Sequence, residues 1–415
     1  MPGLLYPAYQ KLYSALSHLE RFDKEANFFD NISAIDGFFN EYRNITFVIQ
    51  ASLRHTDYIN SYEKNRTRFL NDHWFVEKRN ETIKQAPFAL VKEVRIVLYL
   101  PYGGFTISEK TFTVENDEPL EKVFADIKSI LDAVDAHEVC FSVSFSFHEA
   151  ESNIDLLQRM LNGISSMKEF MDAMDHDVGE QCPLCSQLRA KINELHTADI
   201  PLDFLLTNDY TYYPEKDCFD KAERVSMMLS LDGKKVASRR PLSGLTQAKY
   251  FNYDGTAFGN FTLMHAMLRT LQPGMDIMPA IMVVFDDGTY DLDAFDTTMK
   301  TTMYRKLNET ARLVETANVT EVCYVSLYAV VGLTPDAPHT SRERIAQSNK
   351  DVLVSAGIDK ELNEKEYVFD GTCMENIEYV AHIMKNGLKR ELGASAINLS
   401  PIKRAFEAKK SSVSE

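Results

Sequence analysis

The sequence predicts a mixed α+β protein, in which an N-terminal antiparallel helical bundle is followed by two similar ββαβ modules that a helical insert separates. Three observations lead to this prediction. Apolar residues recur at helical spacing through residues 28–53, strand-like runs begin after residue 89, and one order of strands and helix occurs twice. We expect five parts: a helical bundle at 1–88, a first ββαβ module at 89–150, a helical and loop insert at 151–260, a second module at 261–335, and a C-terminal helical region with a basic tail at 336–415.

The composition is that of a soluble globular protein. The chain has 415 residues, 45% hydrophobic and 26% charged, which is enough for two to four domains with their own cores. No run approaches the length of uncharged apolar residues that a membrane helix needs, and the first residues lack the basic and apolar regions of a secretory signal. The 6 cysteines are widely spread, which favours reduced thiols. We therefore expect a cytoplasmic protein without a membrane partner.

The N-terminal part is helical because of its apolar spacing. From residue 28 to residue 53, apolar side chains recur at steps of three and four, which predicts one long amphipathic helix. We expect shorter helices over 7–21, 57–70 and 72–84. Pro87 ends the last of them, since a residue before proline is pushed out of the α region. Several helices joined by short connections are most economically packed as an antiparallel bundle.

Strands begin after this bundle. Residues 94–100 form an apolar, β-branched run, residues 101–104 supply turn residues, and residues 105–114 read as a returning strand. A helix over 119–134 and a strand over 138–145 complete a ββαβ order. The same order is expected for the strands at 281–285 and 289–295, the helix at 297–316 and the strand at 321–328. Glu138-Val139-Cys140-Phe141 and Glu321-Val322-Cys323-Tyr324 match in sequence, which suggests a duplicated module.

A cluster of acidic residues surrounds the hairpin turn of the second module. Its spacing does not fit a calcium-binding loop, in which a glycine follows three alternating ligands and a glutamate closes the site. We interpret it as turn chemistry, with an Asp-Gly hairpin signal. The cluster consists of Asp286, Asp287, Asp291, Asp293 and Asp296.

The insert contains a long amphipathic helix over 154–174, followed by Cys182-Pro183-Leu184-Cys185. This two-residue gap lets both sulfurs reach one zinc ion. A complete structural zinc site needs two further ligands, for which His196 and Cys218 are the candidates, with His176 as another. Two plain thiols at the start of a helix are the competing interpretation, and a redox pair is less favoured because no strand precedes the motif.

The charge of the chain restricts where nucleic acid could bind. The net charge is −16, yet residues 1–90 hold 11 basic and 11 acidic residues, and residues 385–415 hold 7 basic and 3 acidic ones. Residues 91–384 carry the excess of acidic groups. Nonspecific binding to nucleic acid needs a basic surface that displaces counterions. Any RNA contact is therefore expected in the N-terminal part, in the tail or at a local basic patch.

The last predicted helix of the bundle carries Arg79-Asn80-Glu81-Thr82-Ile83-Lys84. With the long helix over 28–53, this stretch resembles the HEPN superfamily of small helical bundles, many of them dimeric ribonucleases or toxins. The resemblance covers residues 25–88. It implies that Arg79 holds phosphate, that Asn80 shapes the site, and that Lys84 stands where the family has its histidine.

A lysine at this position changes the expected chemistry. Cleavage of RNA through its 2′-hydroxyl needs a group that exchanges protons near neutral pH, as histidine does. We therefore expect a non-catalytic interaction protein, with a degenerate HEPN-like domain that forms a homodimer or binds a nucleic-acid end. The alternative is a HEPN-type ribonuclease of stress response or phage defence, which would use Arg79, Asn80 and Lys84. His55 or His73 would favour the alternative if the fold placed either beside Arg79.

Overall fold

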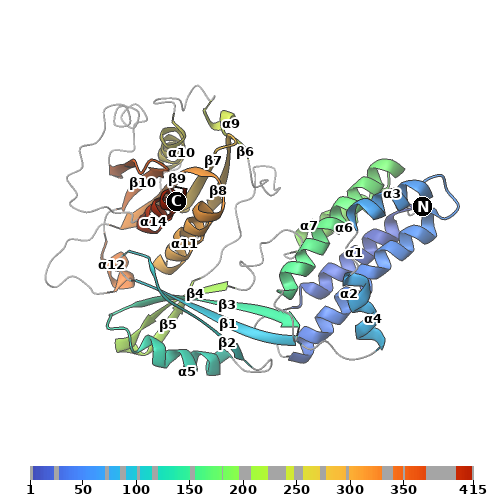
Figure 1. Cartoon of the computed structure of the whole chain (residues 1–415), viewed down its shortest axis with the longest axis horizontal. Helices are drawn as coiled ribbons and strands as arrows, with labels where there is room; N and C mark the ends of the chain where they lie inside the picture. The colour runs from blue at the N-terminus through green and yellow to red at the C-terminus, as the bar shows by residue number, and fades with distance from the viewer. Residues whose placement is uncertain are drawn as a thin grey trace. The chain divides into compact units, whose positions relative to one another are not determined.

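A computed structural model shows a mixed α+β protein with N-terminal helices and two antiparallel sheets (Figure 1). Its described part contains 12 helices. The chain divides into two compact units. Unit 1 consists of residues 1–96, 110–130 and 143–208, and unit 2 consists of residues 97–109, 131–142 and 209–415. The structure describes residues 3–22, 28–70, 74–84, 90–100, 103–114, 120–149, 155–179, 181–195, 207–222, 240–246, 256–271, 277–295, 299–329, 340–348, 351–370 and 399–413.

The helices of the N-terminal part follow the predicted pattern. The long helix α2 spans Phe28–Leu53, as the apolar spacing predicts. Its stripe of buried side chains includes Ile35, Phe38, Ile45, Ile49 and Leu53, all essentially inaccessible to solvent. The other three are α1 (Tyr6–Leu19), α3 (Ile59–Phe69) and α4 (Trp74–Lys84).

Two helices of the predicted insert join this group. The helices α6 (Leu156–Val178) and α7 (Pro183–Glu194) belong to unit 1, where α6 packs on α3 and α7 packs on α1. Asn65 Nδ2 of α3 donates a hydrogen bond of 2.9 Å to Asp177 of α6. In the prediction from sequence, α6 and α7 belong to a separate insert. Their apolar faces are instead buried against helices that lie far away in the sequence.

The first sheet has the strand order β2-β1-β3-β4-β5. The predicted hairpin and closing strand are present, and the helix α5 (Leu120–Leu131) lies between β2 and β3 in the sequence and covers one face of the sheet (Figure 1). The strands are β1 (Leu90–Tyr99), β2 (Thr106–Val114), β3 (Val139–Glu149), β4 (Thr207–Tyr213) and β5 (Cys218–Lys221).

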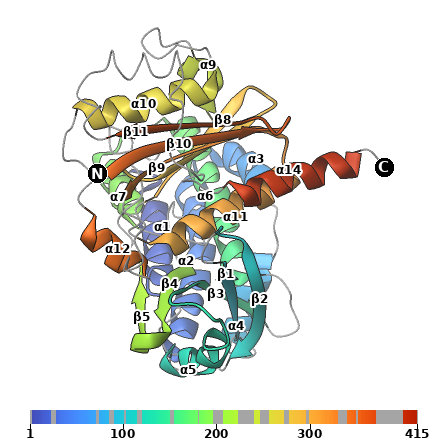
Figure 2. The ribbon, with the colours of Figure 1, turned by 90° about the vertical axis from the view of Figure 1, so that its left-hand side faces the viewer.

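The second sheet has the order β11-β10-β9-β7-β8-β6 and is covered on both faces (Figure 2). One core joins it to α10 (Ala257–Leu271), and another joins it to α11 (Lys300–Thr316) and α14 (Ser400–Val413). The hairpin turn at 286–288 is formed as expected, and Asp287 Oδ1 accepts from the Thr289 backbone N–H at 2.9 Å. The strands are β6 (Arg240–Pro241), β7 (Ala280–Phe285), β8 (Thr289–Ala294), β9 (Val319–Ala329), β10 (Asp351–Asp359) and β11 (Glu364–Asp370).

The predicted helical character of the regions 151–260 and 336–415 is wrong in part. The strands β4 and β5 complete the first sheet, and β10 and β11 complete the second. All seven residues of β4 are buried although most are polar, so its sequence lacks the alternation of a half-exposed strand. Apart from α6, α7 and α10, the described α-helices of these two regions are α14 and two short ones. These short helices are α9 (Leu242–Thr246) and α12 (Ser341–Gln347).

The two sheets share a strand order. The series β2-β1-β3-β4-β5 corresponds, strand by strand, to β8-β7-β9-β10-β11. Cys140 of β3 and Cys323 of β9 are both fully buried. The duplication of the module stays a prediction, which a superposition of residues 94–147 on residues 281–330 would test. Among the described residues, none of the helices is both long enough and apolar enough to cross a membrane.

Candidate functional site

The stretch that resembles the HEPN superfamily lies on α4, as predicted, and the helix ends at Lys84. Asn80 is partly exposed. The side chains of Arg79, Ile83 and Lys84 lie outside what the structure describes, and so does the whole of His73. The roles predicted for these residues therefore remain predictions.

The start of α4 is held in place by aromatic packing. Phe75 is buried and stacks on Tyr42 of α2 with ring centroids 4.6 Å apart. The Tyr42 hydroxyl donates to the carbonyl of Gly163 on α6 at 2.8 Å. A Cβ at Gly163 would lie only 2.1 Å from the Phe75 ring, so this glycine permits the close approach. These contacts fix α4 against α2 and α6, whichever way its polar residues point.

A basic surface with an aromatic ring lies on the neighbouring helices. The segment 43–70 carries five basic and two acidic residues, in contrast to the acidic chain as a whole. Phe47 is 45% exposed, and the guanidinium of Arg43 lies 4.2 Å from the centre of its ring. We name the set the α2–α3 basic surface: Arg43, Phe47, Arg54 and Arg66.

The helical period explains why these side chains face outward. Arg43, Phe47 and Arg54 alternate along α2 and its end with the buried stripe of Ile45, Ile49 and Leu53. On α3, Lys64, Arg66 and Arg68 are exposed, and Arg68 lies 4.8 Å from the ring of Phe69.

Tyr62 joins the two helices beneath this surface. Its side chain is buried, and its hydroxyl donates to the Thr46 carbonyl at 3.2 Å. Burial raises the pKa of Tyr62, while the charges of Arg66 and Arg43 act in the opposite direction. Cations from α2 and α3 therefore act on the same hydroxyl.

This arrangement suits a single-stranded nucleic acid. Guanidinium and ammonium groups bind phosphates, and an exposed ring offers a face on which a base can stack. His55 is exposed in the turn that follows Arg54. Arg43 and Phe47 belong to no catalytic motif, so they are not among the predicted site residues. The available signal was the polar and aromatic face of the 28–53 helix.

The Cys-Pro-Leu-Cys motif forms the first turn of α7. Cys182 is the N-cap residue, and its Sγ accepts hydrogen bonds of 3.3 Å from the backbone N–H groups of Cys185 and Gly3. The thiol of Cys185 and these N–H groups lower the pKa of Cys182.

Within the described part of unit 1, no other candidate zinc ligand forms a cluster with this pair. His176 is an exposed residue of α6 beside Asp177, Cys218 lies on β5 in unit 2, and His196 lies outside the described residues. No cluster of three or more metal-ligating side chains occurs in the described part of the chain. Zinc binding by Cys182 and Cys185 stays a prediction.

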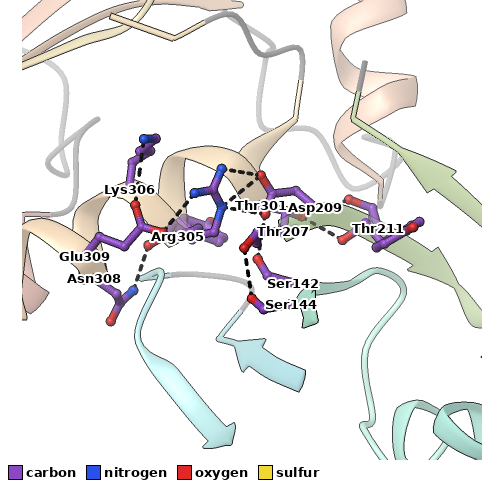
Figure 3. A network of polar contacts seen from close by, with 12 residues as sticks. Ser142, Ser144, Thr207, Asp209, Thr211, Thr301, Arg305, Lys306, Asn308 and Glu309 are labelled. Atoms are coloured by element: carbon purple, nitrogen blue, oxygen red, sulfur yellow. Dashed lines mark hydrogen bonds and ion pairs between the residues drawn. The ribbon is translucent and has the colours of Figure 1, made fainter. Parts of the chain in front are cut away.

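A buried ion pair connects α11 with β4 in unit 2 (Figure 3). Arg305 Nε lies 2.8 Å from Asp209 Oδ1, and Arg305 Nη2 lies 3.0 Å from Oδ2, so the contact is bidentate. Asp209 is 1% exposed and also accepts from Ser142 Oγ at 2.6 Å. Burial acts to lower the pKa of Arg305, but the charges of Asp209 and Glu309 outweigh it and raise that pKa.

A small pocket of about 170 Å³ lies next to this network. Lys306 Nζ in its wall is 2.9 Å from Asp293 and 3.8 Å from Glu309, so its charged groups already neutralise one another in part. We assign the pair and the pocket a structural role, in which the polar face of α11 is satisfied. The pocket is lined by Ile281, Val283, Asp291, Asp293, Lys306, Glu309, Thr310 and Leu313.

Sequence reasoning could not have found the ion pair, since 96 positions separate its two members.

Comparisons of the chain with protein families, with curated proteins and with solved structures find no match.

Proposed function

We propose that this chain is a cytoplasmic interaction protein that binds single-stranded RNA through the α2–α3 basic surface of a HEPN-like helical unit, and that it does so without cleaving the RNA. One observation carries the proposal: an exposed phenylalanine, Phe47, lies under the guanidinium of Arg43 in the basic segment of an acidic chain. Proteins that hold single strands combine cations that follow the backbone with rings that stack on bases.

The charge distribution of the chain supports the α2–α3 basic surface as the RNA site. With a net charge of −16, the chain as a whole repels a polyanion, so binding depends on a local excess of cations. Five cations lie within residues 43–70. If the three cations of the α2–α3 basic surface neutralise phosphates, the logarithm of the affinity falls with the logarithm of salt concentration with a slope of about −2 for a single strand.

The absence of cleavage follows from Lys84. The resemblance to HEPN domains places the catalytic histidine of the family at this position, and a lysine would need its pKa lowered by several units to act as a base near neutral pH. The resemblance also implies a homodimer through the N-terminal helices. A dimer would place two α2–α3 basic surfaces in one particle and strengthen binding to a longer strand.

The alternative, a ribonuclease that uses Arg79, Asn80 and Lys84, is favoured by one observation. His55 is exposed directly after Arg54, so an imidazole, the side-chain type that most often acts in general acid–base catalysis, lies next to the basic surface. A product assay with labelled RNA separates the two functions. Cleavage that disappears in both Arg79→Ala and His55→Ala would replace our proposal with the ribonuclease.

The binding test is fluorescence anisotropy with labelled single-stranded RNA, single-stranded DNA and duplex RNA. Loss of the Phe47 ring is expected to weaken single-strand binding by about 1–3 kcal/mol, whereas duplex binding changes less. Phe47→Leu keeps an apolar side chain and removes the stacking face, so it should behave like Phe47→Ala. Arg66→Ala should weaken binding to every strand and reduce the salt slope by about 0.7.

Lys191→Gln on α7 is the matched control, because it removes one exposed positive charge from the same unit outside the surface. It should leave the affinity for RNA unchanged. Equal weakening by Lys191→Gln and Arg66→Ala would mean that binding depends on net charge alone. Unchanged affinity in Phe47→Leu and Arg66→Ala would reject the α2–α3 basic surface as the RNA site.

A further inference from the structure

The start of α7 places two cysteines on one helical turn in unit 1. Cys182 has extended backbone angles of φ −112° and ψ 109°, and Pro183 begins the helix after it. Cys185 follows at the third helical position, and its N–H donates to the Cys182 sulfur at 3.3 Å. Residues three apart on a helix lie side by side, and an N-cap residue with extended angles can turn its side chain back over the first turn.

A second donor reaches the same sulfur from the N-terminus of the chain. The backbone N–H of Gly3 lies 3.3 Å from Cys182 Sγ, across 179 positions of sequence. Two N–H groups from separate segments thus point at one sulfur, at the positive end of a 12-residue helix. This environment stabilises negative charge that develops on Sγ when it attacks or leaves.

The cysteines inside the sheets have a different environment. Cys140 and Cys323 lie within strands and are 1% and 0% exposed. Cys182 and Cys185 are 8% and 6% exposed, and the residues around them on the turn, including Leu184, are exposed. A small reagent that cannot enter the sheets can reach the α7 turn after a local movement. The two sheet cysteines are therefore internal controls for any reaction at the turn.

We infer that Cys182 and Cys185 form a redox-active dithiol, which low-molecular-weight disulfides oxidise to an intramolecular disulfide. In the first step Cys182 Sγ loses its proton and attacks one sulfur of the oxidant. The oxidant's S–S bond breaks, and its first half leaves as a thiol with that proton. Cys185 Sγ then loses its proton and attacks Cys182 Sγ, which releases the second half as a thiol. The protein loses two electrons and two protons, and the oxidant gains them.

Oxidation has a consequence for the N-terminal segment. A sulfur in a disulfide carries no developing negative charge and is a weaker acceptor than a thiolate, so the Gly3 N–H loses a favourable partner. The segment that leads into α1 is then held less firmly against α7. The dithiol would in this way couple the redox state to the packing of α1 on α7.

The inference is tested on the full chain equilibrated in buffers of increasing ratio of oxidised to reduced glutathione, followed by acid quenching, alkylation and peptide mass spectrometry. Cys182 and Cys185 should lose their free thiols together and appear as one disulfide-linked peptide, while Cys140 and Cys323 stay alkylatable after unfolding. Cys185→Ser should stop the reaction at a glutathione adduct on Cys182. Cys182→Ser should abolish both products, and its hydroxyl keeps an N-cap for α7, so the variant retains the fold.

Cys218→Ser is the matched control, since this half-exposed thiol lies on β5, and its loss should leave the disulfide unchanged. The inference is overturned if Cys218 acquires glutathione in the wild-type chain while Cys182 and Cys185 remain free. It is also overturned if the purified protein holds one zinc ion per chain that protects both thiols until a chelator removes it. A circular dichroism spectrum that matches the wild type establishes that each variant is folded.

Discussion

The helix α5 follows β2 and precedes β3 in the chain, as α11 follows β8 and precedes β9. The two helices are nevertheless buried in different ways. Among the described side chains of α5 the buried ones are Val123, Ile127 and Leu131, which form one stripe at four-residue spacing. In α11 eight residues are buried, among them Arg305. One face of α11 packs on the second sheet through Leu307 and Val314, and another face contacts Val97, Tyr99 and Cys140 through Tyr304.

The difference shows how a helix can have a buried polar face. A helix that covers one sheet leaves its polar residues in water, where they need no protein partner. A helix that is packed on two sides must pair its buried polar groups, because an unpaired buried charge costs several kcal/mol. Arg305 meets this requirement with Asp209 and Glu309, and Lys409 of α14 donates to the carbonyl of Val314 near the end of α11 at 3.0 Å.

The largest expected effect comes from breaking the ion pair of α11. Asp209→Ala leaves Arg305 buried without its bidentate partner and should lower the free energy of unfolding by about 3–5 kcal/mol. Urea denaturation followed by circular dichroism measures this loss. Replacement of both partners, in the double variant Asp209→Leu with Arg305→Met, should recover most of it, since similar apolar side chains remove the charge. A loss below about 1 kcal/mol for Asp209→Ala would show that α11 does not depend on the pair.

A second effect concerns α10 on the opposite face of the second sheet. Burial lowers the pKa of His265 to about 4, and its Nδ1 lies 2.9 Å from the Phe261 carbonyl. The unfolded chain binds a proton near pH 6.5 and the folded chain does not, so stability falls as pH drops from about 6.5 to about 4. The loss should approach about 3 kcal/mol at about 1.4 kcal/mol per pH unit.

His265→Gln removes this titration and keeps a polar side chain at the site. Unfolding free energies of the wild type and of His265→Gln should therefore converge as the pH falls from 7 to 4. Parallel curves for the two proteins would contradict the assignment of this pH dependence to His265.

The smallest expected effects are the stability changes caused by single substitutions on the polar faces of α11 and α5. Thr301 of α11 is fully buried, and its Oγ1 donates to the Tyr210 carbonyl at 2.9 Å. Thr301→Val keeps the shape and should cost about 1–3 kcal/mol, because it removes this buried hydrogen bond. Asp126→Ala on the exposed face of α5 should change stability by less than about 0.5 kcal/mol. Equal losses of unfolding free energy for Thr301→Val and Asp126→Ala, measured by urea denaturation, would show that the polar face of α11 is no more important for stability than that of α5.

The parts of the fold that were predicted correctly are those with a local signal. The helix over 28–53 and the hairpin around Asp287-Gly288 follow from apolar spacing and turn residues that lie close together in the sequence. The strands β4 and β10 were missed for opposite reasons. The segment of β4 falls within the predicted helical and loop insert, and its polar residues show no strand alternation, whereas in the structure Arg305 and Thr301 contact Asp209 and Thr211. In β10 an apolar run that is buried on both faces carries no alternation by which a strand differs from a helix.

For the candidate sites, the sequence by itself determined which residues could act. It placed Arg79, Asn80 and Lys84 on one helix, paired Cys182 with Cys185 on one turn, and concentrated basic residues in the segment 43–70. These features depend only on neighbours within a few positions, where helical geometry fixes the spacing of side chains.

Only the tertiary structure decided which distant groups meet. Gly3 donates to Cys182, Asp209 holds Arg305, and Tyr62 ties α3 to α2 beneath Arg43. Such partners are set by the packing of the whole core, because the gain from a polar contact is about 1 kcal/mol, whereas each buried apolar side chain contributes about 2 kcal/mol. The apolar faces therefore determine how the helices and strands pack, and the polar groups find their partners within the arrangement that results.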